Sequence, residues 1–159
     1  METIISIRHQ QIQLKTSYAY FTSQLEKKVN RLDPKYAKDV LSDPEALRAY
    51  LELLQGDTGL ILFNIQLHGD LLNLFGKPRK AKQYVIGNPL TAIQMTYHNI
   101  GAVLYAPLRM LVYEHENKVA VVEYDLPSSL FGQFGIEAID QVAKTLDSKL
   151  WNVITLCES

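Results

Sequence analysis

Apolar side chains follow two different spacings along this chain, and together they predict both strands and helices. The stretch from Leu108 to Tyr124 holds two runs rich in β-branched and aromatic residues around a polar turn, which is typical of a β-hairpin. Shorter apolar runs predict further strands at residues 4–14, 60–67 and 83–86. Apolar positions at helical spacing predict helices at residues 18–32, 44–54, 89–97 and 136–150, with a short one at 70–74.

The order of these elements predicts an α+β fold. Antiparallel strands with helices between them favour one twisted, mostly antiparallel sheet that carries its helices on one face. A chain of 159 residues without repeats or linkers is expected to form one domain over residues 1–159. Residues 151–159 are expected to be a short C-terminal tail, apolar enough to dock against the domain.

The hairpin allows a prediction about how its two faces are covered. A two-residue loop at Glu116–Asn117 and a four-residue loop at 115–118 give the same register, in which Arg109 lies opposite Tyr124. Side chains alternate between the two faces of a strand, so this register fixes which residues share a face. One face then carries Arg109, Leu111, Tyr113, Ala120, Val122 and Tyr124. The other carries Leu108, Met110, Val112, Val119, Val121 and Glu123.

Neither of these two sets is polar, as one face of a half-exposed sheet should be. The prediction is therefore that both faces are covered near the middle of the hairpin. The chain's own helices would cover one face. A loop, a ligand or a second subunit would have to cover the other, which makes a homodimer or a bound small molecule the expected partner.

Composition narrows the function mainly by exclusion. The hydrophobic content is 47% and the formal net charge is −1, so neither nucleic acid nor a membrane is expected as a partner. The basic run at residues 77–82 is interpreted as a solvated loop rather than a phosphate-binding patch. Cys157 is the single cysteine, which excludes an intrachain disulfide. The start of the sequence does not look like a signal peptide, and the expected location is the cytoplasm.

Arg109, Tyr113 and Tyr124 are the leading candidates for a ligand site, because the predicted register places them on one face. An arginine that stacks on a tyrosine can simply stabilise a sheet, and this interpretation is the favoured one. The same side chains could instead line a pocket between sheet and helices, with Arg109 binding an anionic ligand. Asn88, in the Gly87-Asn88-Pro89 turn, is predicted to cap the following helix and is a further candidate for the pocket.

Other chemistry receives little support from the sequence. None of the common nucleophile, zinc-protease, dinucleotide or phosphate-loop motifs is present, so no catalytic residue and no cofactor is predicted. His68 and Asp70 are a weak alternative as metal ligands, at a spacing that matches no established motif. Glu123 and Asp125 share a strand face and could pair as carboxylates, although a solvated strand edge is favoured. His9 has no visible partner.

Three motifs follow one another along the chain: Ile86-Gly87-Asn88-Pro89, the strand Ala106–Glu114 and the loop Tyr124-Asp125-Leu126-Pro127. Together they resemble domain-of-unknown-function family 302. The resemblance covers residues 59–150, and it implies a β-α-β(4)-α order with the topology called TATA-binding-protein-like. Compared with the shorter members of this family, residues 33–56 look like an insertion that contains an extra helix near residues 43–55. Some relatives have a cysteine where this chain has Gly87, so any thiol chemistry of theirs does not carry over.

Two hypotheses about function follow. The first is a small cytoplasmic binding or assembly module that is homodimeric and has no catalytic role. The second is a protein or enzyme that binds a small anionic molecule in a pocket between sheet and helices, through Arg109, Tyr113 and Tyr124. Family members have no agreed activity, so the resemblance does not choose between the two.

Overall fold

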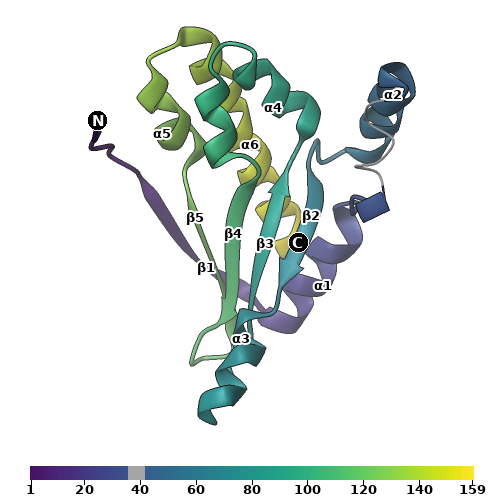
Figure 1. The fold of residues 1–159 in the computed structure, drawn as a ribbon. Helices are drawn as coiled ribbons and strands as arrows, with labels where there is room; N and C mark the ends of the chain where they lie inside the picture. Colours follow the sequence, from purple (N-terminus) through teal and green to yellow (C-terminus); the bar gives the residue numbers. More distant parts are fainter. Residues whose placement is uncertain (36–41) are drawn as a thin grey trace.

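The computed structural model describes residues 1–35 and 42–159, and it has the α+β architecture that the sequence predicts (Figure 1). The strands are β1 His9–Ser17, β2 Ile61–Gln66, β3 Ala81–Gly87, β4 Leu108–Glu114 and β5 Val119–Asp125. The longer helices are α1 Tyr18–Lys28, α2 Pro44–Leu54, α4 Pro89–Thr96 and α6 Glu137–Glu158. Shorter helical segments are α3 His68–Leu71, η2 Leu72–Phe75, η3 Ile100–Tyr105, α5 Pro127–Phe131 and η4 Gly132–Phe134.

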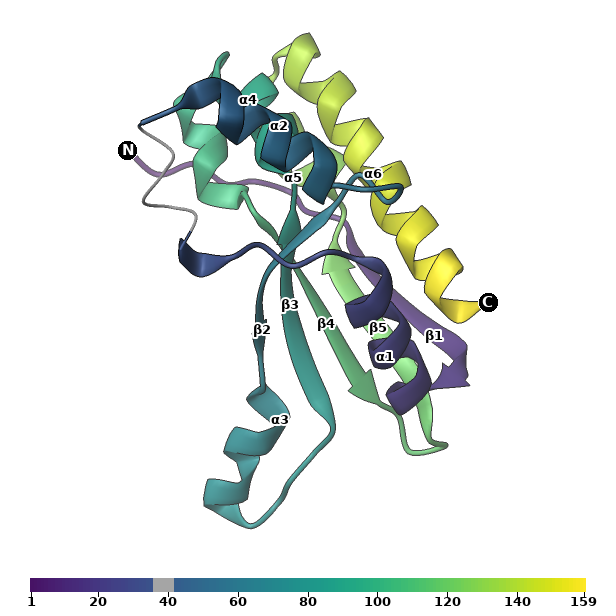
Figure 2. The same ribbon diagram turned by 90° about the vertical axis from the view of Figure 1, so that its right-hand side faces the viewer.

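The five strands form one antiparallel sheet in the order β1-β5-β4-β3-β2. β1, the first strand in the sequence, pairs with β5, the last one. The sheet therefore joins segments that lie far apart in the sequence. The long helices α1 and α6 lie on one face (Figure 2). This arrangement confirms the predicted antiparallel sheet with helices on one side, and it leaves the opposite face, here called the open face, without a long helix.

Local sequence signals explain where the helices begin. Ser17 caps α1 by accepting a hydrogen bond from the Tyr20 amide, and Asp43 caps α2 by accepting one from Ala46. Asn88 caps α4 in the same way, as predicted, and Pro89 occupies its first turn. These caps satisfy backbone amides that have no partner inside the helix. The core lies between the helices and the sheet, around Phe21, Leu25, Tyr84, Met110, Val122, Phe131, Ile139 and Leu150.

The hairpin exists as predicted, but the predicted register is wrong by one residue. Met110, rather than Arg109, pairs with Tyr124. The His115 amide donates to the Val119 carbonyl, which closes a loop of three residues. Lys118 completes this turn with a φ of +71°, a conformation that a hairpin loop of this length requires at its last position. A loop with an odd number of residues shifts β5 by one position relative to the predicted register, so the residues on the two faces of β5 are exchanged.

The corrected register also overturns the prediction that both faces of the hairpin are apolar. The face toward the helices collects the buried side chains of Met110, Val112, Ala120, Val122 and Tyr124. The open face mixes polar and apolar residues, among them Arg109, Leu111, Tyr113, Val121 and Glu123. A face with this mixture is compatible with water. Among these residues Val121 is buried, with 3% of it exposed. Side chains of the chain itself therefore cover the middle of this face, and the hairpin does not require a partner as a second cover.

Three segments add to the five strands and the helices of the core. Residues 151–159, expected as a tail, continue α6 to Glu158 and bury Val153, Ile154 and Cys157 against the core. The expected insertion at 33–56 contains α2, although its residues 36–41 lie outside the described part of the chain. Between β2 and β3, α3 and η2 form an arm that projects beyond the strands (Figures 1 and 2). Within the described residues, no helix combines the length and hydrophobicity needed to span a bilayer.

Candidate functional site

The open face carries a compact set of hydrogen-bonded side chains from three neighbouring strands of the sheet, β1, β5 and β4. The Tyr113 hydroxyl donates to Glu123 Oε1 at 2.7 Å. Gln11 donates to the same carboxylate oxygen and also to the Tyr113 hydroxyl, the latter at 3.2 Å. The strand pairing accounts for this proximity, because Gln11 lies directly opposite Glu123 and Tyr113 lies one strand further across. We call Tyr113, Glu123, Gln11, His9 and Asp125 the polar cluster.

His9 extends this cluster along the edge strand. Its Nδ1 lies 2.9 Å from Asp125 Oδ1, and its Nε2 lies 3.1 Å from Glu123 Oε2. The hydrogen bonds to Asp125 and then to Glu123 raise the pKa of His9 above its ordinary value of 6.5. Each ring nitrogen faces a carboxylate, so the charged imidazolium can donate to both acidic side chains at once.

The pKa values of Tyr113 and Glu123 shift in opposite directions. The hydrogen bond from Tyr113 is the largest of the effects that lower the pKa of Glu123, followed by the one from Gln11. The same bond to Glu123 raises the pKa of Tyr113, with partial burial as the next cause. At neutral pH the cluster therefore holds an ionised Glu123 and a protonated Tyr113, in a geometry that orients the phenol ring.

A groove with a volume of about 680 Å³ lies beside the cluster, between the open face and the arm. Its lining combines polar and charged side chains with apolar ones: His68, Gly69, Leu71, Leu72, Arg79, Ala81, Leu111, Tyr113 and Glu123. A concave site with apolar walls and a few convergent polar groups is the usual form of a small-molecule site. The perturbed pKa values of Tyr113 and Glu123 at its rim are a further property of such sites.

Gly69 allows the arm to approach the sheet closely enough to form one wall of this groove. A Cβ atom at this position would lie 2.0 Å from the Arg79 carbonyl oxygen and 2.6 Å from the Ala81 amide nitrogen. Both neighbours are backbone atoms, which cannot rotate away as the end of a side chain can. The absence of a side chain at Gly69 is therefore a geometric requirement for packing α3 against the start of β3.

Arg79 is the strongest cation of the groove. Arg79 lies two residues before the start of β3. None of the ion pairs formed within the described residues includes its guanidinium. Its charge acts to lower the pKa of Tyr113, although the bond to Glu123 outweighs this effect. Glu123 on β5 lies opposite Leu111 on β4, and Leu111 lies opposite Gln83 on β3, four residues after Arg79. Arg79 and Glu123 are therefore separated both across the strands and along them. The groove therefore has a basic end and an acidic end.

The structure separates the three side chains that the sequence analysis grouped. Tyr113 lines the groove, as a pocket residue should. Arg109 is exposed on the open face but does not belong to the groove lining. Tyr124 points the other way, into the core, where only 5% of it is exposed and burial raises the pKa of its hydroxyl. The structure therefore does not bring the side chains of Arg109, Tyr113 and Tyr124 together.

Asn88 lines a different cavity, of about 290 Å³, between α4, η3 and Pro107. This cavity does lie on the helical side, but its walls are almost entirely apolar. The polar atoms of Asn88 are already bonded: Oδ1 accepts from the Leu90 amide, and Nδ2 donates to Gln55 Oε1 and to the Gly59 carbonyl. The structure thus assigns Asn88 to the architecture of the turn, where it ties α4 to the end of α2.

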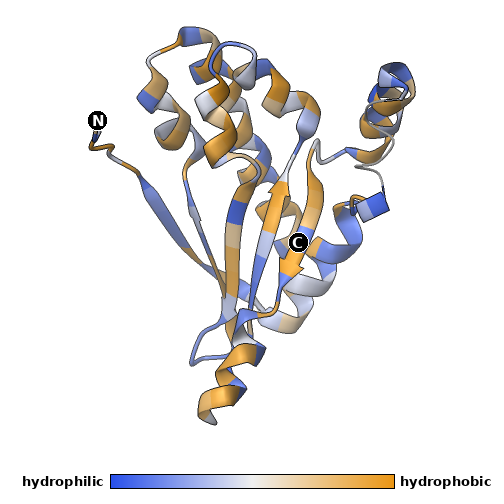
Figure 3. Ribbon diagram, in the orientation of Figure 1, coloured by the Kyte–Doolittle hydropathy of each residue, from blue (hydrophilic) through white to orange (hydrophobic). Residues whose placement is uncertain are grey.

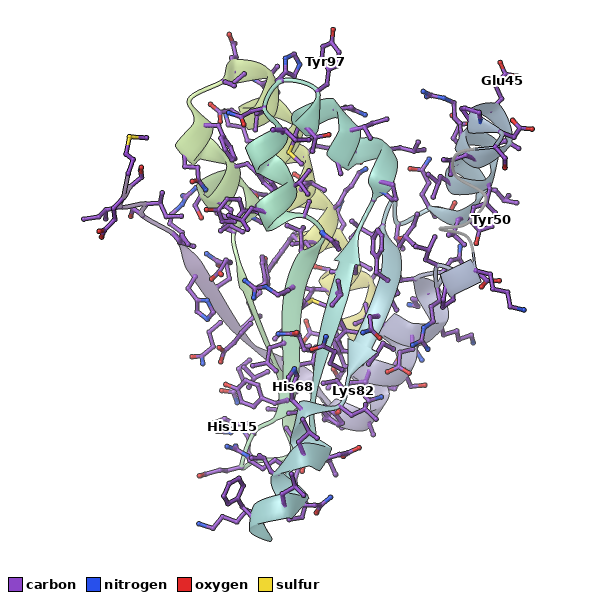
Figure 4. All side chains as sticks on the ribbon, viewed as in Figure 1. Glu45, Tyr50, His68, Lys82, Tyr97 and His115 are labelled. Atoms are coloured by element: carbon purple, nitrogen blue, oxygen red, sulfur yellow. The ribbon has the colours of Figure 1, made fainter. Side chains whose placement is uncertain are left out.

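His68 and Asp70, the two candidate metal ligands, lie at the base of the arm. His68 Nε2 is 2.9 Å from Gln66 Oε1, and the ring contributes to the groove lining (Figure 4). The part of the chain that the structure describes contains no group of three His, Cys, Asp or Glu side chains arranged to hold a metal ion. The pair of His68 and Asp70 therefore gains no additional ligand from the fold.

Comparison with known proteins identifies the family. The family described as "Domain of unknown function DUF302" matches residues 35–156, which is most of the chain. The chain belongs to the DUF302 family. A crystal structure of an uncharacterised conserved DUF302 protein from Bacillus stearothermophilus covers 94% of this chain and 97% of its own, with a TM-score of 0.65 and 16% identity. At this identity the likeness shows a shared fold alone, and no curated protein matches the chain.

The DUF302 assignment confirms the family that three motifs indicated, but not the label TATA-binding-protein-like, which stays a prediction. Sequence reasoning missed three members of the site, which are His9, Gln11 and Arg79, and it did not connect Glu123 and Asp125 with Tyr113. The sequence did place Glu123 and Asp125 two residues apart on one strand, which predicts that their side chains share a face. The signal for His9 was absent, because its partners are 114 and 116 positions away in the sequence.

Proposed function

We propose that this protein is a binding module for a small amphipathic anion, which lies in the groove on the open face of the sheet. The observation that carries the proposal is the presence of Arg79 and Tyr113 in one concavity with the apolar side chains of Leu71, Leu72 and Leu111. As in the sequence-based hypothesis, the ligand is anionic and Tyr113 contacts it. The binding arginine is now Arg79 instead of Arg109, and the site lies on the open face of the sheet instead of the helical side.

The chemistry of the groove selects both the charge and the orientation of such a ligand. The planar guanidinium of Arg79 can bind a carboxylate or phosphate with two parallel hydrogen bonds. The three leucines offer contact to an alkyl or aryl body. At the other end, ionised Glu123 repels an anionic group, so the ligand's charged end is directed to Arg79. The volume of about 680 Å³ lies within the range of common ligand pockets.

The polar cluster supports binding by fixing the position of Tyr113. Its hydroxyl donates to Glu123 and accepts from Gln11, so the ring cannot rotate without losing both bonds. A wall that is held in place before the ligand arrives reduces the entropy lost on binding. The proposal requires no catalytic step from these residues.

The test uses a panel of matched ligands with equal carbon chains: alkyl carboxylates, alcohols and amines. Amide chemical shifts of the intact, isotope-labelled protein report the site. We expect the carboxylates to shift amides of Leu111, Tyr113 and Ala81, and the alcohols and amines to bind about tenfold more weakly or not at all. Arg79→Ala should remove this preference. Arg109→Ala is the matched control, since Arg109 is exposed on the same face outside the groove and should leave binding unchanged.

Two results would overturn this proposal. One is the absence of carboxylate-induced shifts at the groove in the wild-type protein. The other is an equal effect of Arg79→Ala and Arg109→Ala, since a general loss of positive charge from the open face would then explain the result. Thermal melting of both variants checks that the fold is intact, and little change is expected because both side chains are exposed.

Self-assembly into a homodimer is a second candidate function, supported by a different surface. Exposed apolar side chains gather on α4 and η3, at the opposite end of the molecule from the arm, and they are Ile93, Tyr97, Ile100, Val103 and Leu104. An apolar patch of this kind often marks a protein interface. Sedimentation equilibrium tests it: the wild type should be dimeric and Leu104→Asp monomeric. A wild type that stays monomeric at high concentration would exclude a dimer through this patch.

A further inference from the structure

The end of the arm exposes apolar side chains in a regular, hydrogen-bonded turn. Leu74 is 84% exposed and Phe75 is 82% exposed, although residues of these types are normally buried. The turn is held by the Gly76 amide, which donates to Asn73, and by the Lys77 amide, which donates to Leu72. Gly76 supplies the left-handed conformation, with a φ of +67°. Figure 3 shows this apolar tip at the far end of the arm.

Positive charge follows the apolar tip directly. Lys77, Arg79 and Lys80 lie in the loop that returns to β3, and residues 71–80 contain no aspartate or glutamate. Lys80 is paired with Glu114 at 2.9 Å, whereas the ion pairs of the described residues do not include Lys77. The combination of projecting apolar side chains with adjacent cations is complementary to one kind of surface, in which negative headgroups overlie hydrocarbon.

We infer that the tip is a peripheral membrane contact, in which Leu74 and Phe75 enter the acyl boundary and Lys77 faces anionic headgroups. This contact does not span the bilayer, and it departs from the sequence-based expectation that no membrane is a partner, which rested on the net charge of the whole chain. It is independent of the proposed ligand groove, because neither Leu74, Phe75 nor Lys77 belongs to the groove lining.

The size and shape of the tip favour a lipid surface over a second copy of the chain. Two large side chains at the end of a narrow projection expose roughly 300 Å², estimated from the usual area of such side chains. A stable protein interface buries about 800 Å² on each partner and needs a complementary surface. A fluid bilayer needs neither, because its lipids rearrange around a convex apolar group.

The test measures co-sedimentation of the whole chain with vesicles of two compositions. One is phosphatidylcholine alone, and the other is an equal mixture of phosphatidylcholine and phosphatidylserine. We expect binding to the anionic vesicles only, weakened by added salt. Phe75→Ser should weaken binding about tenfold or more, and Lys77→Ala about fivefold. Leu53→Ser is the matched control, since Leu53 on α2 is 81% exposed and should not matter.

Phe75→Trp provides a direct readout of insertion. Its emission should shift to shorter wavelength on anionic vesicles, against the constant signal of Trp151 on α6. Equal sedimentation of the wild type, Phe75→Ser and Leu53→Ser would overturn the inference. So would a wild-type dimer that Phe75→Ser converts to a monomer, because a second copy would then be the partner of the tip. Circular dichroism of each variant verifies the fold, and Arg79→Ala tests the groove separately.

Discussion

The Tyr113 hydroxyl and Glu123 Oε1 lie 2.7 Å apart as diagonal neighbours on the open face of the sheet. In the register of the hairpin, Tyr113 pairs directly with Val121, and Leu111 pairs with Glu123. This diagonal contact exists only because the loop has three residues. With the even loop that the sequence suggested, Glu123 would lie on the opposite face. The position of one turn residue therefore decides whether the polar cluster forms.

Replacing Tyr113 by phenylalanine should raise the pKa of Glu123 toward its ordinary value of 4.5, because it removes the largest cause of the lowering. A lowered carboxyl pKa stabilises the fold above the unfolded pKa, and this stabilisation is lost as the pH falls through the folded value. The variant should lose about 0.5–1.5 kcal/mol near neutral pH. The difference from wild type should shrink below about pH 4.5.

Carboxyl chemical shifts of Glu123 and urea unfolding over this pH range measure both effects. Tyr97→Phe is the control, since Tyr97 is 87% exposed and should leave both unchanged. A Glu123 titration identical in wild type and Tyr113→Phe would contradict the role given to this hydrogen bond.

His9 should contribute a stability that depends on pH in the opposite sense. Its folded-state pKa is raised, so its contribution is fully present below 6.5 and is lost as the pH rises through the folded value. The ring is 54% exposed, which limits the effect to at most about 1 kcal/mol. His9→Gln should therefore destabilise the protein at about pH 6 and have almost no effect at about pH 8.5.

Unfolding curves of wild type and His9→Gln at the two pH values measure this difference. His98→Gln serves as the control, because His98 has no carboxylate partner among the ion pairs of the described residues. A cost for His9→Gln that is the same at both pH values would mean that packing, rather than charge, is what His9 contributes.

Asn88→Ala should destabilise the fold by about 2–3 kcal/mol without affecting the ligand groove. It removes the cap of α4 and the two hydrogen bonds that Nδ2 donates to Gln55 and Gly59. Asn88→Ser keeps an N-cap acceptor and should recover about 1 kcal/mol of this loss. Asn99→Ala removes a cap whose side chain makes no second hydrogen bond to the described residues, and it should cost only about 1 kcal/mol.

Urea unfolding gives these free energies, and the carboxylate titration of the groove gives the binding comparison. If Asn88→Ala abolished carboxylate binding while the free energy of unfolding stayed near that of wild type, Asn88 would be a ligand residue after all. The structure gives it no such role.

Ile154→Ala tests whether the last residues are part of the core. Ile154 is 2% exposed on α6, so its truncation should cost about 2–5 kcal/mol in urea unfolding. Leu156→Ala, two residues further on and 44% exposed, should cost less than about 1 kcal/mol. Similar small costs for both variants would indicate that residues 151–159 do not pack as the structure shows.

Sequence reasoning identified the elements of this fold well, because the signals for them are local. The caps at Ser17, Asp43 and Asn88 act on amides within three positions, and apolar periodicity is a property of the helix or strand itself. The extension of α6 through residues 151–158 escaped notice, although its buried side chains Val153, Ile154 and Cys157 continue the helical spacing.

By itself, the sequence determined the fold class, the order of the strands and longer helices, the family and the cap that begins α4. Only the tertiary structure decided which side chains meet. A one-residue difference in the hairpin loop exchanged the faces of β5, separated Arg109 from Tyr124 and joined Tyr113 to Glu123. The edge strand β1 then brought His9 to carboxylates more than a hundred positions away. Local hydrogen bonds and periodicity cannot encode such contacts, because strand pairing depends on the packing of the whole sheet.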